Sequence, residues 1–539
     1  MERSFSKEVE ALRLGAGETF RGEGILAVTK ALLQSGVSYV GGYQGAPVSH
    51  LLDVMVEAKD LLGELGVHVE TCTNEAAAAA MLGASINYPL RGAVTWKSIV
   101  GTNVAADALS NLASPGVIGG ALIVLGEDYG EGASVIQERS YAYAMKSSIW
   151  LLDPRPDLPA IVHMVEKGFE LSEASHAPVM LDLRVRACHL TGEFTAKDNK
   201  PGLYNAQHRL AGPVRFEYGR LSHPPATFAQ ERLKIEQRLP AAQKFICEQK
   251  LNELIAGEIG EIGIIVLGGL TNGLLRALAR LDLADLYGVS RIPIYVLNVA
   301  YPLVPKEVGE FCAGKRAVLV VEEGSPNYVE QQINVILRNA GADTRVYGKG
   351  CLPASGDYTS EVLLRGIAAF AAAAQPTGIA AQSISRHVEE IVAHRTSALA
   401  ALHDIPARPP NFCTSRAPSF CRDQAGAARI RTGPYQRRHR LPFLRDLCAV
   451  LARQFHSWLR HVAGERGRGR SKHGEASDRG DGRWRFLAQR VDYRRRLERV
   501  QQGRRRARDH AERLRLGNRP AIFAVEQRAS RGRIGRNQH

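Results

Sequence analysis

The first 194 residues alternate between strand-like and helix-like stretches of hydrophobic residues. GEGILAVTKALLQSG at 22–36 has apolar residues at helical spacing and ends on glycine, a common residue just past a helix. VSYVGGY at 37–43 follows as a short buried strand, and EAAAAAMLGASI at 75–86 is a strong helix former. GALIVLGED at 120–128 and PVMLDLRV at 178–185 are apolar runs typical of parallel-sheet strands. Strand and helix in rotation predict a doubly wound α/β domain over residues 1–194.

A second region with the same rhythm begins near residue 258. IGIIVLGGLTNGLLRALARL at 262–281 is predicted as strand, glycine turn and helix, and PIYVLNV and AVLVVEEG are further predicted strands. The turn does not match GxGxxG, so we interpret it as a structural connection and not as a nucleotide site. The sequence thus predicts a connecting region at 195–257, a second α/β domain at 258–375 and a helix with a Pro-rich linker at 376–413.

The net charge of +15 is unevenly distributed along the chain. Residues 414–539 hold 33 Lys and Arg against 11 Asp and Glu, whereas residues 1–413 are mildly acidic. A basic tail on an α/β body is one feature of nucleic-acid-binding proteins, because cationic side chains neutralise phosphates. A nucleic-acid-binding protein with a basic tail is therefore an alternative hypothesis.

The eight cysteines form no CxxC pair, so no zinc or iron–sulfur spacing is visible and no metal ligand is predicted. The N-terminal stretch MERSFSKEVEALRLG lacks the apolar core of a secretory signal. No apolar run approaches the ~18 residues of a membrane span. These features predict no membrane partner and a reducing cytoplasm with free thiols.

Five segments in order resemble one enzyme family. YVGGYQGAPVSHLLD is similar to a family turn written YPGTPSSE, and VETCTNEAAAAAMLGAS to EWSVNEKVALEIAAGAS. TWKSIVGTNVAADALSNLA resembles TMKHVGLNVAADPLMTLA, LNVAYPLVPKEVGEFCAGKRAVLVVEEGSP resembles a later strand-and-loop pattern, and RPPNFCT matches the lead-in to FCTGCP. The family is the alpha subunit of indolepyruvate ferredoxin oxidoreductase, and the resemblance spans about residues 12–414. It implies a thiamine-diphosphate pyrimidine-binding domain followed by a transketolase C-terminal-like domain.

The resemblance assigns a catalytic role to Glu75. Thiamine catalysis needs a carboxylate against N1′ of the aminopyrimidine, fixed in an apolar cleft where its hydrogen bond is strong. On the residues alone, Glu75 is better interpreted as a glutamate that stabilises the start of the alanine-rich helix, beside the capping candidates Thr73 and Asn74. The family motif favours the catalytic reading, and Glu70 is the weaker candidate.

The first and third motifs supply the expected cofactor-binding residues. The segment 43–47 would be a loop at the carboxyl end of a strand, where ligands bind in open α/β sheets. By resemblance, the cofactor-binding residues are Tyr43, Gly45, Ala46, Pro47, Lys97 and Asn103.

The chain departs from the family at two points of these motifs. Ala46 replaces a threonine whose hydroxyl usually helps to hold substrate or cofactor, and one extra residue precedes Asn103. Substrate identity and the register of the third motif therefore stay open. Lys97 has an alternative reading as a solvated surface lysine.

The family reaction implies the remaining cofactors and partners. An arylpyruvate, coenzyme A and oxidised ferredoxin give an aryl-acetyl thioester, CO₂ and reduced ferredoxin, with thiamine diphosphate and Mg²⁺ bound. A smaller beta subunit is the expected partner. Intact family members also carry a [4Fe–4S] domain and a third domain that binds the diphosphate and Mg²⁺, and the motifs of both are absent from this sequence.

The tail nevertheless contains a hidden order. RWRFLAQR, Arg483–Arg490, can be encoded so that the frame one base later reads DGGFWHNG, similar to the family's GDGGFWHNG. In the same frame, Tyr435–Asp446 permits ISADIGCHSFAT and Glu512–Glu526 permits NGYASATGQQYLPSS, in the family's order. GC-rich codons read out of frame also explain 32 arginines beside one lysine after Cys413. We therefore interpret residues 414–539 as a frameshifted replacement of the diphosphate-binding domain, with the break between Cys413 and Phe420.

This interpretation carries two expectations. The tail lacks a hydrophobic period, so it cannot bury enough apolar surface to offset its ordering entropy and is predicted to be disordered. The chain alone is predicted to be inactive, and nucleic acid is expected to bind only non-specifically through the tail.

Overall fold

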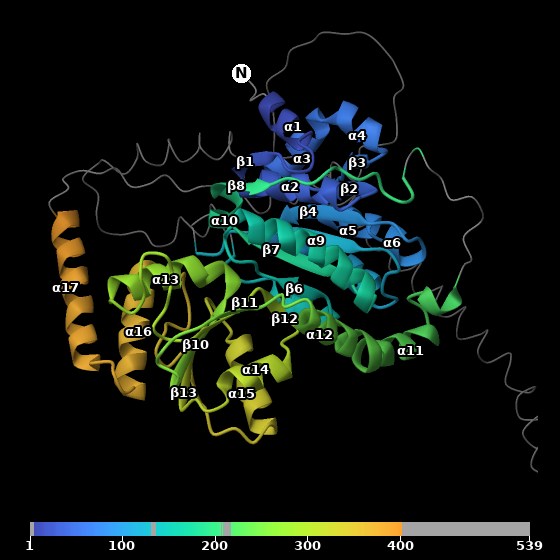
Figure 1. Cartoon of the computed structure of the whole chain (residues 1–539). Coiled ribbons are helices and arrows are strands. Elements are labelled where there is room, and N and C mark those ends of the chain that lie inside the picture. Colours follow the sequence, from blue (N-terminus) through green and yellow to red (C-terminus); the bar gives the residue numbers. More distant parts are fainter. Residues whose placement is uncertain (1–4, 131–135, 206, 208–216, 401–539) are drawn as a thin grey trace, which may run out of the picture. The chain divides into compact units, whose positions relative to one another are not determined.

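The computed structural model describes residues 5–130, 136–205, 207 and 217–400, all within one compact unit. The expectations for residues 414–539 therefore fall outside the described residues. Figure 1 shows the described elements coloured along the chain.

Seven strands form the first sheet, in the order β12-β6-β7-β5-β4-β2-β3. All neighbours pair in parallel except β12 and β6. Every residue of the central β4 and β5 is buried, as the apolar runs predict. The strands are β2 (Tyr39–Gly42), β3 (His68–Thr71), β4 (Gly92–Lys97), β5 (Ala121–Glu127), β6 (Trp150–Leu152), β7 (Val179–Arg184) and β12 (Val299–Tyr301).

Helices cover both faces of this sheet. Along β5, Leu122 and Val124 pack into one core, and Ile123 and Leu125 into another. The first core contains residues of α2 (Gly24–Gln34), α3 (Ser49–Glu57), α9 (Leu158–Ser175) and α12 (Leu239–Glu248). The second contains residues of α5 (Glu75–Met81), α7 (Ser98–Ala113) and α8 (Tyr141–Ser147). The predicted doubly wound arrangement is confirmed.

Short elements complete the first region. An antiparallel pair joins β1 (Thr19–Glu23) to β8 (Thr191–Thr195). The shorter helices are α1 (Ser6–Leu12), α4 (Lys59–Leu65), α6 (Ala84–Asn87) and α10 (Val185–His189). The expected helix at 75–86 is interrupted between α5 and α6 around Gly83, a residue type of low helix propensity. Gly36 follows α2 with φ of 71°, as expected of a glycine past a helix end.

Five strands form the second sheet, in the order β14-β13-β10-β11-β9. The strands are β9 (Glu253–Ile255), β10 (Ile262–Leu267), β11 (Ile294–Leu297), β13 (Ala317–Val321) and β14 (Arg345–Tyr347). Only β9 is antiparallel to its neighbour, and the strand order reverses at β10, as in doubly wound sheets.

The α-helices that follow β10 along the chain are α13 (Thr271–Arg280), α14 (Pro305–Cys312), α15 (Tyr328–Asn339), α16 (Ser360–Ala374) and α17 (Ala381–Ala400). The helices α16 and α17 lie side by side (Figure 1). Between β10 and α13, a β-carbon on Gly268 would lie 2.0 Å from the Asp153 carbonyl oxygen, so this turn needs glycine for close packing. That packing agrees with a structural turn.

One strand expectation is wrong. PIYVLNV was expected to be a single strand, but Asn298 divides it into β11 in the second sheet and β12 in the first. The buried Asn298 amide donates to the Leu251 carbonyl (3.0 Å) and to Glu253 (2.9 Å), which fixes the crossing. The connecting region holds α11 (Ala226–Leu233), a π-helical turn (Lys234–Arg238), α12 and β9.

Candidate functional site

The segment between β2 and α3 forms a tight loop at the carboxyl edge of the first sheet. The Tyr43 N–H donates to the Thr95 carbonyl (3.0 Å), and the Val48 N–H donates to the Gly45 carbonyl (3.1 Å). Tyr43 is exposed, and Ala46 is half-buried. The loop therefore lies at the carboxyl end of β2, as the sequence predicts, and a backbone hydrogen bond links it to β4.

Two glycines bring this loop close to the strand ends. A β-carbon on Gly45 would lie 2.8 Å from the Lys97 Cβ and 2.9 Å from the Lys97 nitrogen. A β-carbon on Gly126 would lie 2.6 Å from the Pro47 Cδ. The loop thus packs on the ends of β4 and β5 at distances that no larger side chain allows.

Lys97 is buried beneath this loop. It ends β4, only 2% of its side chain is exposed, and its ammonium forms an ion pair with Asp128, whose side chain is 1% exposed. The reading of Lys97 as a solvated surface lysine is excluded. A buried cation that is paired in this way has a fixed position and contributes its charge to the edge of the sheet.

Glu75 is the first residue of α5 and is only 8% exposed. The side chain of Asn74 caps this helix by accepting from the Ala77 N–H (2.8 Å), so Glu75 is not needed as the cap. A β-carbon on Gly101 of α7 would lie 2.9 Å from the Glu75 Cγ, so Glu75 packs against the first turns of α7. Burial raises the pKa of Glu75, and its own backbone N–H partly offsets this.

The structure brings Glu75 and the Gly45 loop to the same helix start. Glu75 contacts Gly101 of α7, and Gly45 contacts Lys97, which directly precedes α7. Among the described residues, no side-chain hydrogen bond or ion pair engages the Glu75 carboxylate. A buried carboxylate of this kind can accept a hydrogen bond from a ligand.

Two other candidates from the sequence, Asn103 and Glu70, do not join Glu75 in this site. Asn103 is exposed, and its side-chain oxygen accepts from the Tyr143 hydroxyl. On a helix it points about 160° away from Gly101, so it does not join Glu75. Glu70 is 60% exposed and pairs with His68 (3.4 Å), which removes it as a buried catalytic carboxylate.

A second group of buried charges, which the sequence reading missed, gathers at the strand ends. Glu127 ends β5, Asp182 lies two residues before the end of β7, and Asp153 directly follows β6. The register pairs Leu125 with Asp182 and Glu127 with Arg184, so these side chains share one face of the sheet. At most 2% of each of the three carboxylate residues is exposed.

Two arginines join these carboxylates to the second sheet. Arg184 forms ion pairs with Asp153 (3.1 Å) and with Glu323, which lies two residues after β13. Arg139 lies 3.6 Å from Asp182 and 3.9 Å from Asp153. These residues therefore form a buried ionic link between the two sheets. We call this group the ionic cluster; its members are Glu127, Arg139, Asp153, Asp182, Arg184 and Glu323.

The two arginines stabilise the carboxylates of the ionic cluster to different extents. Burial raises the pKa of Glu127, and burial together with repulsion from Glu127 and Asp153 raises the pKa of Asp182 well above its usual range. Burial also acts on Glu323, but Arg184 and Arg139 hold its pKa below the usual value. Oε2 of Glu127 and Oδ1 of Asp182 have no hydrogen-bond partner among the described residues.

The sequence did carry a weak signal for this cluster. Glu127, Asp153 and Glu323 end or follow apolar runs, in GED, LLD and VVEE, whereas Asp182 lies within one, in MLDLR. Acids at such positions are also common as plain strand boundaries, and only the topology brings distant segments together. The described residues contain no group of three or more His, Cys, Asp or Glu side chains arranged to hold a metal ion. Nor does this part of the chain have a helix long and apolar enough to cross a membrane.

Comparison with known proteins supports the family resemblance. No family model matches the chain. The indolepyruvate oxidoreductase subunit IorA of Methanothermobacter thermautotrophicus is 28% identical over 392 residues, and that of Thermococcus kodakarensis is 27% identical over 387 residues. The chain resembles IorA subunits. The resemblance predicted from the motifs is thereby confirmed.

The match to IorA is partial in length. Each alignment covers 72% of this chain but only 57% and 56% of the two IorA subunits, so the chain spans little more than half of the relatives that it matches. Among solved structures, a 2-oxoglutarate:ferredoxin oxidoreductase from Magnetococcus marinus matches with a TM-score of 0.47 and 18% identity, over 65% of this chain and 64% of that one.

Proposed function

We propose that the described residues form the pyrimidine-binding and transketolase C-terminal-like domains of an IorA-type alpha subunit. The corresponding reaction is the oxidative decarboxylation of an arylpyruvate to an acyl thioester of coenzyme A, with electrons passed to ferredoxin. Glu75 carries this proposal, because it is a buried carboxylate at a helix start with no charged partner among the described residues.

The residues present fit the pyrimidine end of thiamine diphosphate. The bound cofactor would supply the carbon nucleophile and the electron sink for decarboxylation. Glu75 would accept a hydrogen bond from N1′ of the aminopyrimidine, and its apolar surroundings strengthen that bond. The loop around Gly45 and the buried Lys97 would shape the neighbouring wall of the site.

Ala46 bears on the substrate. A methyl group there donates no hydrogen bond, so the loop would hold a 2-oxoacid by backbone groups and shape alone. The assignment of an arylpyruvate therefore rests on the family resemblance alone, and Ala46 is a departure from the threonine of that family.

The described residues do not provide a binding site for the diphosphate of thiamine diphosphate. In the family a third domain holds the diphosphate and Mg²⁺, and we propose that the frameshifted tail after Cys413 replaces that domain. A single carboxylate hydrogen bond contributes about 1.5–3 kcal/mol. Micromolar affinity needs about 8 kcal/mol. The 539-residue chain should therefore bind thiamine diphosphate very weakly and reduce no ferredoxin.

Calorimetry on the whole chain with Mg²⁺ and thiamine diphosphate tests this proposal. We expect no binding in the micromolar range, and micromolar binding would contradict the inactive assignment. Restoring the reading frame after Cys413 should recover binding, and ferredoxin reduction when the beta subunit is present. In that restored chain, Glu75→Gln should abolish activity while the exposed control Glu70→Gln retains it. Equal activity of the two variants would refute the role of Glu75.

The remaining assignments follow the same proposal. The partners would be a beta subunit, ferredoxin and coenzyme A, and a [4Fe–4S] cluster belongs to intact family members only. The cytoplasm is the proposed location, and the free thiols of Cys72, Cys188 and Cys312 fit a reducing compartment. The nucleic-acid alternative depends on residues 414–539, which lie outside the described residues.

A further inference from the structure

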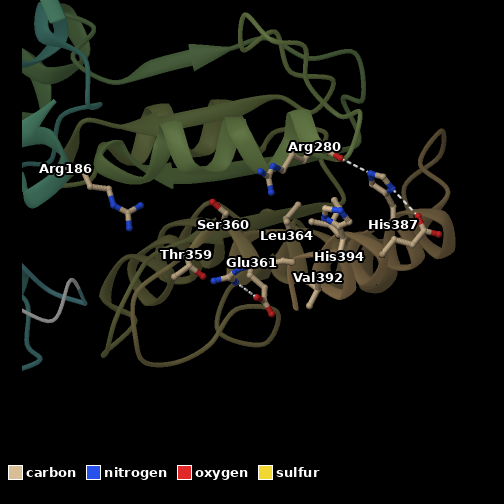
Figure 2. Close-up of a pocket in the computed structure, with 12 residues that line it drawn as sticks. Arg186, Arg280, Thr359, Ser360, Glu361, Leu364, His387, Val392 and His394 are labelled. Atoms are coloured by element: carbon tan, nitrogen blue, oxygen red, sulfur yellow. Dashed lines mark hydrogen bonds and ion pairs between the residues drawn. The ribbon is translucent and has the colours of Figure 1, made fainter. Parts of the chain in front are cut away.

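The surroundings of Glu75 are set by β4 and α7, and not by the cleft drawn in Figure 2. That cleft has a volume of about 870 Å³ and is lined mainly by residues of α13, α16 and α17. Its lining includes no residue of β4, α5 or α7. The groups that hold the Glu75 side chain therefore lie in the core between β4 and the first turns of α7.

Trp96 lies beside Glu75, and both contact α7 at Gly101. A β-carbon on Gly101 would lie 2.3 Å from the Trp96 Cδ1 and 2.9 Å from the Glu75 Cγ. Because both atoms lie that close to one point, the sum of the two distances, 5.2 Å, is an upper limit on their separation. The indole ring and the Glu75 side chain are therefore adjacent, and the absence of a side chain at Gly101 gives both of them room against α7.

A hydrogen bond fixes the orientation of the Trp96 indole ring. Trp96 is the last but one residue of β4 and is completely buried. Its Nε1–H donates to the hydroxyl oxygen of Thr102 (3.2 Å), which is also completely buried. A buried indole N–H needs an acceptor, so this hydrogen bond selects one orientation of the ring. Since Cδ1 is covalently bonded to Nε1, the same orientation places Cδ1 beside Glu75.

The Trp96 indole forms an apolar wall beside the Glu75 carboxylate. Such a wall restricts the rotamers of Glu75 and keeps water from one side of its carboxylate. Burial is the main cause of the raised pKa of Glu75, which agrees with this shielding. The titratable groups on the packed elements are engaged with other residues: Lys97 of β4 with Asp128, Asp107 of α7 with Asn111, and Tyr39 of β2 with Ser85.

We propose that Trp96 is a positioning residue for Glu75: its indole, oriented by Thr102, holds the carboxylate in one position and shields it from water. This inference rests on the role of Glu75 in the proposed function. A carboxylate that is fixed in advance needs no rearrangement when N1′ of the aminopyrimidine approaches, and preorganisation of this kind assists catalysis. Trp96 would act on the reaction through Glu75 and not by contact with the cofactor.

The fluorescence of Trp96 in the 539-residue chain tests the contact. A neutral carboxyl group beside an indole quenches its emission more strongly than a carboxylate does, so emission should rise as pH increases through the pKa of Glu75. The chain has four tryptophans, and the contribution of Glu75 is therefore the step in emission that Glu75→Gln removes. Trp96→Phe should remove the same step, within the pH range where circular dichroism shows the fold intact.

Two control variants separate this contact from general effects of pH. Glu70→Gln changes an exposed carboxylate and should leave the step intact. Trp150→Phe removes a second completely buried indole, which donates to the Ser175 hydroxyl oxygen (2.7 Å) in the core on the other face of the sheet, and should also leave the step intact. A step that survives Trp96→Phe, or that Trp150→Phe removes, would overturn the contact between Trp96 and Glu75.

Two substitutions of Thr102 test the orientation of the ring while Trp96 stays in place. Thr102→Val removes the acceptor of the indole N–H, so the ring loses its fixed orientation and water reaches the Glu75 carboxylate. The midpoint of the step should therefore move to lower pH, toward the usual pKa of a glutamate. Thr102→Ser retains a hydroxyl group and should retain the native midpoint. Equal midpoints for Thr102→Val and the native chain would overturn the positioning role, whether or not Trp96→Phe folds.

Activity distinguishes this inference from the proposed function itself. In the frame-restored chain with the beta subunit, Thr102→Val should lower kcat about tenfold and leave the KM for the 2-oxoacid unchanged, whereas Thr102→Ser should retain the native kcat. Full activity of Glu75→Gln would refute the proposed function, and the positioning role of Trp96 with it. An inactive Glu75→Gln variant together with a fully active Thr102→Val variant would refute the role of Trp96 alone.

Discussion

Asp182 shows how a single buried residue can make stability depend on pH. Its side chain is buried beside Glu127 and Asp153, and Arg139 at 3.6 Å only partly compensates. Its pKa in the folded protein is raised above the unfolded value of about 3.9. The folded state therefore holds this proton more tightly, so the contribution of Asp182 to stability is greatest in acid and falls as pH rises through the raised pKa.

Asp182→Asn should flatten this pH dependence. The amide keeps the shape but cannot ionise, so the free energy of unfolding should fall less between about pH 5 and about pH 8 than in the native chain. Urea unfolding at both pH values measures this. A residual slope should remain because the pKa of Glu127 is also raised. The exposed control Asp60→Asn should keep the full slope, and an unchanged slope in Asp182→Asn would contradict the prediction.

At the level of single residues, the sequence indicated which residues to consider but not how buried they are or which residues they contact. The motif selected Glu75 and Lys97, and both are buried, but the ion pair of Lys97 with Asp128 follows only from the fold. The same motif could not show that Asn103 turns toward Tyr143, because one residue of register rotates a helical side chain by about 100°.

Among the elements, the turn after β2 depends on close backbone packing. A β-carbon on Gly45 would lie 2.9 Å from the Lys97 nitrogen, which belongs to a central strand and cannot move easily. Gly45→Ala should therefore lower the free energy of unfolding by about 1–3 kcal/mol. In a frame-restored chain it should also weaken thiamine diphosphate binding, because Lys97 and the loop must separate.

Gly63→Ala is the matched control for this substitution. A β-carbon there meets no atom within 4 Å, and Gly63 lies inside α4. Alanine should raise the free energy of unfolding by up to about 1 kcal/mol, since it favours the helix. Urea denaturation of both variants compares them directly, and equal stability of the two would show that Gly45 is not tightly packed.

The pattern of elements was largely predictable because buried parallel strands leave strong signals. The runs that became β5, β7 and β13 are almost wholly apolar, and the helix 22–36 ended where its glycine indicated. The division of PIYVLNV was not predictable, because a buried strand reads the same whichever sheet it joins. Only the partners of Asn298, on a segment more than 40 residues away, decide the crossing.

For the whole molecule, the ionic cluster joins what the sequence describes as separate domains. Arg184 at the end of β7 binds Asp153 and Glu323, and Glu323 in turn accepts from the Tyr358 N–H (2.6 Å). Arg184 and Glu323 lie 139 residues apart in the chain, so no local sequence pattern could reveal this contact. The cluster makes the stability of the first sheet depend on the second.

A double-mutant cycle on Arg184 and Glu323 measures this dependence. Arg184→Met leaves Glu323 and Asp153 buried without their partner and should lower the free energy of unfolding by about 3–5 kcal/mol. Glu323→Gln should also destabilise, but the double variant should lose less than the sum of the two, because the second change removes an uncompensated charge. The exposed pair Arg365–Glu389, with 45% and 66% of the side chains exposed, is the control and should couple by less than about 1 kcal/mol. Additive losses at Arg184 and Glu323 would mean that the two sheets are not linked through this pair, and that their contact rests on apolar packing instead.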